Sequence, residues 1–349
     1  MKLALVTDIH FGARNDNQRV ADFQERFFKE EFFPYLDEHN ITTVVDLGDT
    51  FDRRKYINFY SLDGAKKMFF DPLIERNIQL HALVGNHDSF YKNTLEINSM
   101  RLLAEHYDNI VVYDNPTEWN GIMMLPWICQ ENEQEVFDLC AKTNCQVLFG
   151  HLELMGYQMY KGQSIYHGMK DDWLKRFDVV CSGHYHTKST QGNVNYLGCP
   201  YEMTWSDAGD QKGFHIFDTE TRELEFITNP NTLFKKIWYD DKDAVVTDII
   251  EQDMEQYANS YIKLIIKNKT NPYWFDMYIE RLEKVNPIHL QVVEDHLNLD
   301  LEDEEDVIAE AEDTLTILNN YVEDLDVSAD KEAITKEIHE LYSEALSVS

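Results

Sequence analysis

Five short polar motifs, each placed directly after an apolar run, constrain this sequence more than any other feature. They are Asp8-Ile9-His10, Gly48-Asp49-Thr50-Phe51-Asp52, Gly85-Asn86-His87-Asp88, Gly150-His151 and Gly183-His184-Tyr185-His186. The preceding runs are short and rich in β-forming residues, and several are fully apolar, which predicts strands buried on both faces. Ligands of open α/β sheets bind at the carboxyl ends of the strands. The motifs therefore predict one site at a single sheet edge.

The first two hundred residues alternate such runs with longer helical patterns, which predicts a layered α/β core over residues 1–230. The expected strands are Leu3–Thr7, Thr43–Leu47, Gln79–Val84, Ile110–Tyr113, Ile122–Leu125, Gln146–Phe149, Asp178–Cys181 and Val194–Leu197. The expected helices are Val20–Asp37, Tyr60–Glu75, Leu95–His106 and Glu131–Ala141. A hairpin of Phe214–Asp218 and Glu223–Ile227 is expected to close this core.

Two smaller regions follow the predicted core. Residues 231–298 combine strand-like runs at Tyr261–Ile266 and Ile288–Val293 with a helix that starts near Pro272, which predicts a small α+β domain. Residues 299–349 begin with an acidic stretch, after which apolar residues recur every three to four positions. This spacing predicts a C-terminal pair of amphipathic helices.

The charge of the chain is strongly acidic. The net charge is −33, and the stretch from Val285 to Asp330 holds fifteen acidic residues and no Lys or Arg. A protein that gripped phosphates alone should carry a basic face. Either bound cations and a basic partner handle the phosphates, or the substrate is not a polymer.

The five cysteines form no Cys-x-x-Cys pair, and no run approaches the roughly 20 apolar residues of a membrane span, so we expect a cytoplasmic protein.

The motifs supply a mixed nitrogen and oxygen ligand set. Carboxylate, imidazole and amide groups suit Mn²⁺ or Fe²⁺ and accept Zn²⁺. Asp49 is the natural bridge between two cations, because candidate ligands precede and follow it. Two cations roughly 3.5–4 Å apart can activate a shared hydroxide for in-line displacement at phosphorus. Each motif taken singly is more often a helix cap or a turn, so the prediction depends on their joint occurrence, and Asp88 is interpreted as a helix cap only.

This set of motifs resembles that of the calcineurin-like metallophosphoesterase superfamily. Within it, the chain is similar to the SbcD-type repair nucleases, above all to the recombination endonuclease subunits of T-even-like bacteriophages. The similarity is carried further by Leu125–Trp127, Gly150–Leu154, Tyr160–Gly162, His167-Gly168, Ser182–His186 and Phe217–Thr221. It covers residues 1–230 well and the remainder only in outline.

The resemblance implies two metal sites and a proton donor. It implies one metal held by Asp8, His10, Asp49 and His186, and a second held by Asp49, Asn86, His151 and His184. His87 would be the general acid or would stabilise the leaving oxygen, with its imidazole oriented by the carboxylate of Asp52. Asp52 is a departure, since cellular relatives often have His there, and an Asp changes which group can donate a proton.

The resemblance also implies the activity and the partners. We expect a Mn²⁺-dependent DNA exonuclease and endonuclease of a recombination and double-strand break repair complex, with Fe, Mg or Zn as alternative metals. The expected partners are DNA, contacted by a capping domain over residues 231–298, an SbcC-type coiled-coil P-loop ATPase, and a second copy of the chain. The C-terminal helices either dock on the ATPase or pack on their own domain. A phage origin would place the protein in the host cytoplasm.

Two other functions stay open at this point. A phosphomonoesterase of the protein Ser/Thr phosphatase type shares the phrases Gly48–Arg53 and Gly85–His87, although the pair His184 and His186 points away from it. A DNA-end scaffold without catalysis would keep the fold, although this chain retains every ligand candidate.

The run Asp300–Asp306 is a solvated linker in our interpretation, and one hypothesis is that it keeps the nuclease off DNA until the partner is present.

Overall fold

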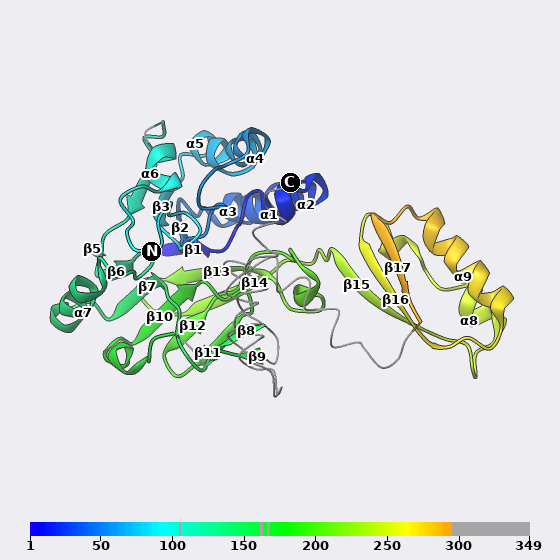
Figure 1. The fold of residues 1–349 in the computed structure, drawn as a ribbon. Helices are drawn as coiled ribbons and strands as arrows, with labels where there is room; N and C mark the ends of the chain where they lie inside the picture. Colours follow the sequence, from blue (N-terminus) through cyan, green and yellow to red (C-terminus); the bar gives the residue numbers. More distant parts are fainter. Residues whose placement is uncertain (105, 161–162, 166–167, 295–349) are drawn as a thin grey trace, which may run out of the picture. The chain divides into compact units, whose positions relative to one another are not determined.

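The computed structural model describes residues 1–104, 106–160, 163–165 and 168–294 (Figure 1). The predicted C-terminal helices, the acidic run and His167 lie outside the described residues. Residues Met1–Val293 group into one unit by their contacts. The boundary between residues 230 and 231 therefore stays a prediction.

Within the described residues, two six-stranded sheets form the core, in the orders β14-β13-β1-β2-β3-β4 and β11-β12-β10-β7-β6-β5. The first contains β1 (Lys2–Val6), β2 (Thr43–Asp46), β3 (Gln79–Leu83), β4 (Ile110–Tyr113), β13 (Gly213–Asp218) and β14 (Leu224–Thr228). The second contains β5 (Thr117–Trp119), β6 (Ile122–Leu125), β7 (Val147–His151), β10 (Val179–Gly183), β11 (Ser189–Gln191) and β12 (Val194–Tyr196). Strands β8 (Gln158–Tyr160) and β9 (Gln163–Ser164) pair with each other.

Alternate residues of the central strands face different layers, as the two-residue period of a strand requires. Leu3 and Leu5 of the first sheet pack with Phe149 of the second, in a cluster to which both sheets contribute. Ala4 packs with Phe28 in a second cluster on the helix-covered face. This arrangement confirms the layered α/β prediction. The division into two sheets does not follow from the sequence pattern, because an apolar run does not tell which strands pair.

Helices cover the outer faces of the sheets (Figure 1). They are α1 (Ala13–Asp16), α2 (Gln18–Phe27), α3 (Phe33–His39), α4 (Phe59–Ala65), α5 (Asp71–Glu75), α6 (Ser99–Ala104) and α7 (Glu133–Lys142). Two predicted long helices each contain a π-helical turn, Phe28–Phe32 and Lys66–Phe70, placed just before Pro34 and Pro72. Proline lacks an N–H and crowds the carbonyl four residues back, so a wider turn accommodates it.

Residues after the hairpin form an α+β unit. Its parallel sheet has the order β15 (Phe234–Asp240), β16 (Tyr261–Asn268) and β17 (His289–Val293). Helices α8 (Val246–Ile250) and α9 (Pro272–Lys284) lie on one side of it (Figure 1). Strand β15 is not among the predicted strands, because Lys235 and Lys236 interrupt its apolar pattern.

All five cysteines are buried, and none of them forms a disulfide. None of the helices among the described residues has both the length and the apolar character needed to cross a membrane.

Candidate metal centre

The five motifs meet at the carboxyl ends of five strands. Strands β1, β2 and β3 are parallel neighbours, and so are β7 and β10. Asp8, Asp49 and Asn86 follow the first three strands, His151 ends β7, and His184 follows β10. Parallel neighbours end at the same edge of their sheet, and the two sheets pack on each other, so both edges deliver side chains to one place. The single sheet edge that the motifs predict is thus an edge of each of two sheets.

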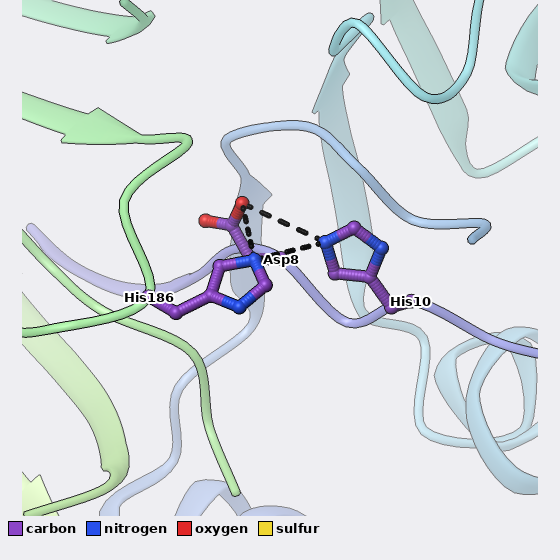
Figure 2. Close-up of side chains that lie close together, drawn as sticks. All are labelled: Asp8, His10 and His186. Carbon is purple, nitrogen blue, oxygen red and sulfur yellow. Dashed lines mark hydrogen bonds and ion pairs between the residues drawn. The ribbon is translucent and has the colours of Figure 1, made fainter. Parts of the chain in front are cut away.

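The first group of side chains consists of Asp8, His10 and His186 (Figure 2). The Nε2 atoms of His10 and His186 are 3.1 Å apart. Oδ1 of Asp8 lies 3.9 Å from Nε2 of His10 and 3.7 Å from Nε2 of His186. All three residues are buried, and their ligand atoms lie within 4.8 Å of one another.

The second group consists of Asp49, Asn86, His151 and His184. Nε2 of His151 lies 3.2 Å from Oδ2 of Asp49 and 3.1 Å from Oδ1 of Asn86. Nδ1 of His184 lies 3.0 Å from the same oxygen of Asn86. The structure therefore gathers all seven predicted ligands into two adjacent groups.

Asp49 lies between the two groups. Its Oδ2 atom is 3.2 Å from Nε2 of His151 in the second group and 3.9 Å from Nε2 of His10 in the first. Its Oδ1 atom accepts the backbone N–H of His87 at 2.8 Å, which fixes the carboxylate. Burial opposes the charged form, but His151 and His87 hold the pKa of Asp49 well below its usual range.

The protonation states of the histidines fit a cation site. Nδ1 of His151 must donate to the carbonyl of Leu47 at 2.8 Å, so Nε2 of the neutral ring points a lone pair at two acceptor oxygens. A metal ion at that point, or a proton on Nε2, removes the repulsion. Burial lowers the pKa of His151, but Asp49 outweighs it and raises the pKa to about 9, so a proton binds there when no metal does.

Two other imidazoles of the groups are neutral. Burial, and then the neighbouring His10, lowers the pKa of His186 to about 3. Burial and His151 hold the pKa of His184 well below its usual value. Burial also disfavours charged His10, but Asp52 and Asp49 outweigh it and raise its pKa to about 10. Neutral imidazole, carboxylate and amide oxygen form a donor set that suits Mn²⁺, Fe²⁺ or Zn²⁺.

Two glycines permit the close approach of the ligand loops. A Cβ atom on Gly85 would lie 2.2 Å from Oδ1 of Asp49, and one on Gly183 would lie 2.0 Å from Oγ1 of Thr7. That hydroxyl donates to Oδ2 of Asp8 at 2.8 Å. The glycines before Asn86 and His184 are therefore required by space, where the sequence suggests tight turns.

His87 and Asp52 are in contact, but through the backbone carbonyl of Asp52 and not through the carboxylate that the resemblance implies. Nδ1 of His87 donates to the backbone carbonyl of Asp52 at 2.6 Å. The carboxylate of Asp52 lies instead 3.4 Å from Nδ1 of His10. The expectation that this carboxylate orients His87 is thus corrected, because the chain turns at Asp52 and presents its carbonyl to the imidazole. Asp52 touches both a candidate ligand and the candidate acid.

Asp88 has a larger role than the helix cap that the sequence suggests. Its buried carboxylate accepts the backbone N–H groups of Asp49 at 2.8 Å, Gly85 at 3.0 Å and Phe51 at 3.2 Å. It therefore ties the loop after β2 to the loop after β3. An acid directly after the Asn-His pair is the only sequence signal of this role.

Lys212 is a residue of the site that sequence reasoning misses. This lysine is 3% exposed, and its ammonium donates to the carbonyl of His186 at 2.8 Å. It forms ion pairs with Asp207 at 2.6 Å and Asp210 at 3.2 Å, so its three donors have three acceptors. Burial opposes the charge, but Asp207 raises the pKa of Lys212 well above its usual value. No local sequence pattern marks a lysine that contacts a motif so distant in sequence.

Trp127 is partly buried against the core, and its ring centroid lies 5.0 Å from that of His184.

The chain is similar to several known proteins. A sequence profile of the calcineurin-like phosphoesterase family matches residues 1–188. The chain is 32% identical over 355 residues to exonuclease subunit 1 of Enterobacteria phage T4, with 99% of each chain covered. It is 21% identical over 310 residues to the SbcD component of the nuclease SbcCD of Staphylococcus epidermidis, with 79% of each chain covered. Among solved structures, an archaeal phosphodiesterase is 14% identical over 66% of this chain and 100% of its own, with a TM-score of 0.33.

Proposed function

The chain belongs to the calcineurin-like phosphoesterase family, and from that premise we propose that it is a two-metal DNA nuclease subunit of a recombination and repair complex. The full-length similarity to a phage exonuclease subunit supports the substrate, and the similarity to an SbcD nuclease supports it independently. The observation that carries the proposal is the position of Asp49 between two groups of buried ligand atoms.

We assign one cation to Asp8, His10, Asp49 and His186, and a second to Asp49, Asn86, His151 and His184. Bound there, two cations would supply Lewis acidity at the phosphate and lower the pKa of a water molecule. Mn²⁺ is the metal that we favour, because the donors mix imidazole nitrogens with carboxylate and amide oxygens.

His87 supplies the proton in this proposal. Because Nδ1 donates to the carbonyl of Asp52, Nε2 is the nitrogen left to exchange a proton, and the imidazolium form would release the Nε2 proton to a leaving oxygen. The His87 ring lies 4.9 Å, centroid to centroid, from that of His10 in the first group. The proton donor is thus adjacent to the ligands without being one of them.

An ATPase partner accounts for the acidic charge. A chain with a net charge of −33 repels the DNA backbone over most of its surface. We infer that a coiled-coil P-loop ATPase subunit holds much of the DNA, and that the cations neutralise the scissile phosphate.

A second copy of the chain is the partner that we propose for the surface between α4 and α6. A cavity of about 330 Å³ lies there, with Leu62 and Ile97 in its lining. Around it, Tyr56 is 59% exposed and Leu102 is 60% exposed, and nearby Phe59 is 88% exposed. Large apolar side chains gathered on a surface mark an interaction site.

Sedimentation velocity tests this dimer. We expect the wild type to sediment as a dimer and Leu102→Glu as a monomer, because a charge would be buried in the interface. Val246→Glu, at an exposed position on α8, is the matched control and should stay dimeric. A monomeric wild type at micromolar concentration contradicts the proposal.

The activity itself is tested with two substrates in parallel. Linear duplex DNA and p-nitrophenyl phosphate are incubated with Mn²⁺ and either the wild type or His87→Ser. We expect the wild type to degrade the duplex and to leave the monoester nearly intact. His87→Ser should lose about 100-fold or more in cleavage while it still binds Mn²⁺.

The phosphomonoesterase alternative has a distinct outcome. If the monoester is hydrolysed well and the duplex survives even with the ATPase subunit added, the family assignment stands and the nuclease proposal is wrong.

A further inference from the structure

The three-stranded sheet of residues 234–293 has one face that its helices leave uncovered. Residues alternate between faces along a strand. Tyr239, Ile262 and Leu264 belong to the apolar cluster that contains residues of α9. Their neighbours in the strands point the other way. We call this second surface the open sheet face, and it consists of Lys236, Trp238, Ile265, Lys267, Gln291 and Val293.

The charge of these strands is opposite to that of the chain. Strands β15, β16 and β17 contain four lysines and a single carboxylate, Asp240, whereas the whole chain has 64 acidic and 31 basic residues. Lys236 and Lys267 lie on the open sheet face, whereas Lys235 pairs with Ile262 of the helix-covered side and Lys263 is buried. Asp240 follows a register shift, and its Oδ1 atom accepts the side-chain N–H of Asn268 at 2.9 Å. A local excess of lysine on an acidic protein indicates an anionic ligand.

Trp238 lies at the centre of this lysine excess. Its side chain is 53% exposed, an unusual position for the largest apolar side chain. Nζ of Lys267 lies 5.9 Å from the centroid of its ring, on the neighbouring strand. In the register, Trp238 pairs with the buried Ile265, which pairs with Val293. The ring of Trp238 therefore lies beside the ammonium group of Lys267, and apolar residues are its neighbours across the sheet.

The other end of the same strands is covered by the core. The Phe234 ring packs against Trp205 with centroids 5.0 Å apart and stacks on Tyr261 at 5.2 Å. Nζ of Lys263 lies 4.6 Å from the centroid of Trp205. Those aromatic side chains are thus occupied, and Trp238 is the aromatic residue of this side that is open to a ligand.

We propose that the open sheet face binds single-stranded DNA, with an unpaired base stacked on Trp238 and a phosphate beside Lys267. Stacking on one aromatic face requires a base that is out of the duplex, and lysines follow the backbone without reading sequence. This inference deepens the nuclease function proposed above and depends on it. It gives the acidic chain a contact with the strand that it cleaves or releases.

The test measures affinity for a fluorescein-labelled oligothymidine by anisotropy. The full-length chain is used with Mn²⁺ in a His87→Ser background, so that the metal is present and cleavage is slow. We expect Trp238→Ala to weaken binding by about tenfold. Lys267→Gln should weaken it less and should lower the salt dependence by about 0.7 in the log–log slope.

Tyr273→Ala is the matched control, because Tyr273 is an exposed aromatic residue of α9, 69% exposed, on the helix-covered side of the sheet. Its binding should equal that of the parent. Hydrolysis of bis-p-nitrophenyl phosphate, measured with His87 intact, should be unchanged in all variants. If the wild type does not hydrolyse bis-p-nitrophenyl phosphate, the proposed nuclease function itself is wrong.

Two results would overturn the inference while leaving the nuclease function intact. One is equal oligothymidine affinity for Trp238→Ala and the parent, or no measurable affinity in the parent. The other is normal DNA affinity for Trp238→Ala together with weaker association with the ATPase subunit, which would make the open sheet face a protein interface.

Discussion

The strand-end edge that holds the two ligand groups and the open sheet face are built in opposite ways. At the edge, Asp8, Asp49 and His151 are at most 2% exposed, and each is held by hydrogen bonds to neighbouring loops or strands. On the open sheet face, Trp238 is 53% exposed, and its position depends on the pleat of β15. One region fixes polar atoms in place, and the other presents an aromatic side chain to solvent.

This contrast separates chemistry from binding. Fixed, desolvated polar groups stabilise charge without reorganisation, so removal of one supporting partner should reduce catalysis. An exposed aromatic ring between lysines tolerates varied ligands, so its removal should reduce affinity alone. If the edge is interdependent in this way, substitutions at Asp88, Asp52, Lys212 and His81 should differ in effect according to what each side chain holds.

Asp88→Ala should have the largest effect. Four backbone N–H groups that hold the loops after β2 and β3 would lose their acceptor. We expect duplex cleavage to fall more than about 100-fold and the free energy of unfolding to fall by about 3 kcal/mol. Asp88→Asn keeps an acceptor oxygen. Its cleavage rate and its free energy of unfolding should therefore lie between those of the wild type and of Asp88→Ala. Full activity of Asp88→Ala would show that these loops need no such tie.

Asp52→Asn should have the next largest effect. The carbonyl that receives His87 remains, whereas the charge beside Nδ1 of His10 is removed. We expect cleavage to fall about 10- to 100-fold, less than for His87→Ser, with weaker Mn²⁺ binding measured by calorimetry. Asp63→Asn removes an exposed carboxylate paired with Lys67 and should change neither quantity. A loss equal to that of His87→Ser would restore a direct catalytic role for the carboxylate.

Lys212→Met tests whether a residue outside the five motifs supports metal binding. It should weaken Mn²⁺ binding at one of the two sites by about tenfold, because the carbonyl of His186 loses a donor. The unpaired Asp207 should also cost about 3 kcal/mol of stability, and Lys212→Met/Asp207→Asn should recover part of it. In a His186→Ala background, Lys212→Met should weaken Mn²⁺ binding no further. An additive loss there would mean that Lys212 does not act through His186.

His81 should give the smallest effect, visible only in acid. This residue of β3 is buried, with Nδ1 2.8 Å from the hydroxyl of Tyr113, and burial lowers its pKa to about 4. The unfolded chain protonates this imidazole near pH 6.5, whereas the folded chain keeps it neutral. Its contribution is therefore complete above pH 6.5 and is lost as the pH falls toward about 4.

Thermal unfolding between pH 7.5 and 4.5 measures this loss. We expect a loss of about 2 kcal/mol in the free energy of unfolding for the wild type and a flatter profile for His81→Gln. His289→Gln, at an exposed position in β17, is the control and should retain the wild-type profile. Identical profiles for the wild type and His81→Gln would exclude this source of acid sensitivity.

The strand-end edge can be predicted from the sequence far better than the surfaces can. An apolar run followed by Asp8 or Asn86 marks a strand end, because burial and polarity change within a few residues. The contact between Lys212 and His186 joins segments far apart in the chain, and no local pattern records it. Strand β15 escapes prediction because two adjacent lysines, Lys235 and Lys236, interrupt its apolar pattern. They face opposite sides of the strand, and the sequence alone does not show which residues face which side.

Asp52 shows the same limit of local patterns. A motif shows that Asp52 is near His87, but only backbone geometry decides whether the carboxylate or the carbonyl meets the imidazole. The pairing of strands into two sheets is likewise beyond local patterns, since every buried strand has the same apolar character.

The most direct test of the central claim is anomalous diffraction at the manganese edge from a crystal grown with Mn²⁺. We predict two peaks, one enclosed by Asp8, His10 and His186 and one enclosed by Asn86, His151 and His184, with Asp49 in contact with both. A single peak, or peaks that Asp49 does not join, would contradict the two-metal site.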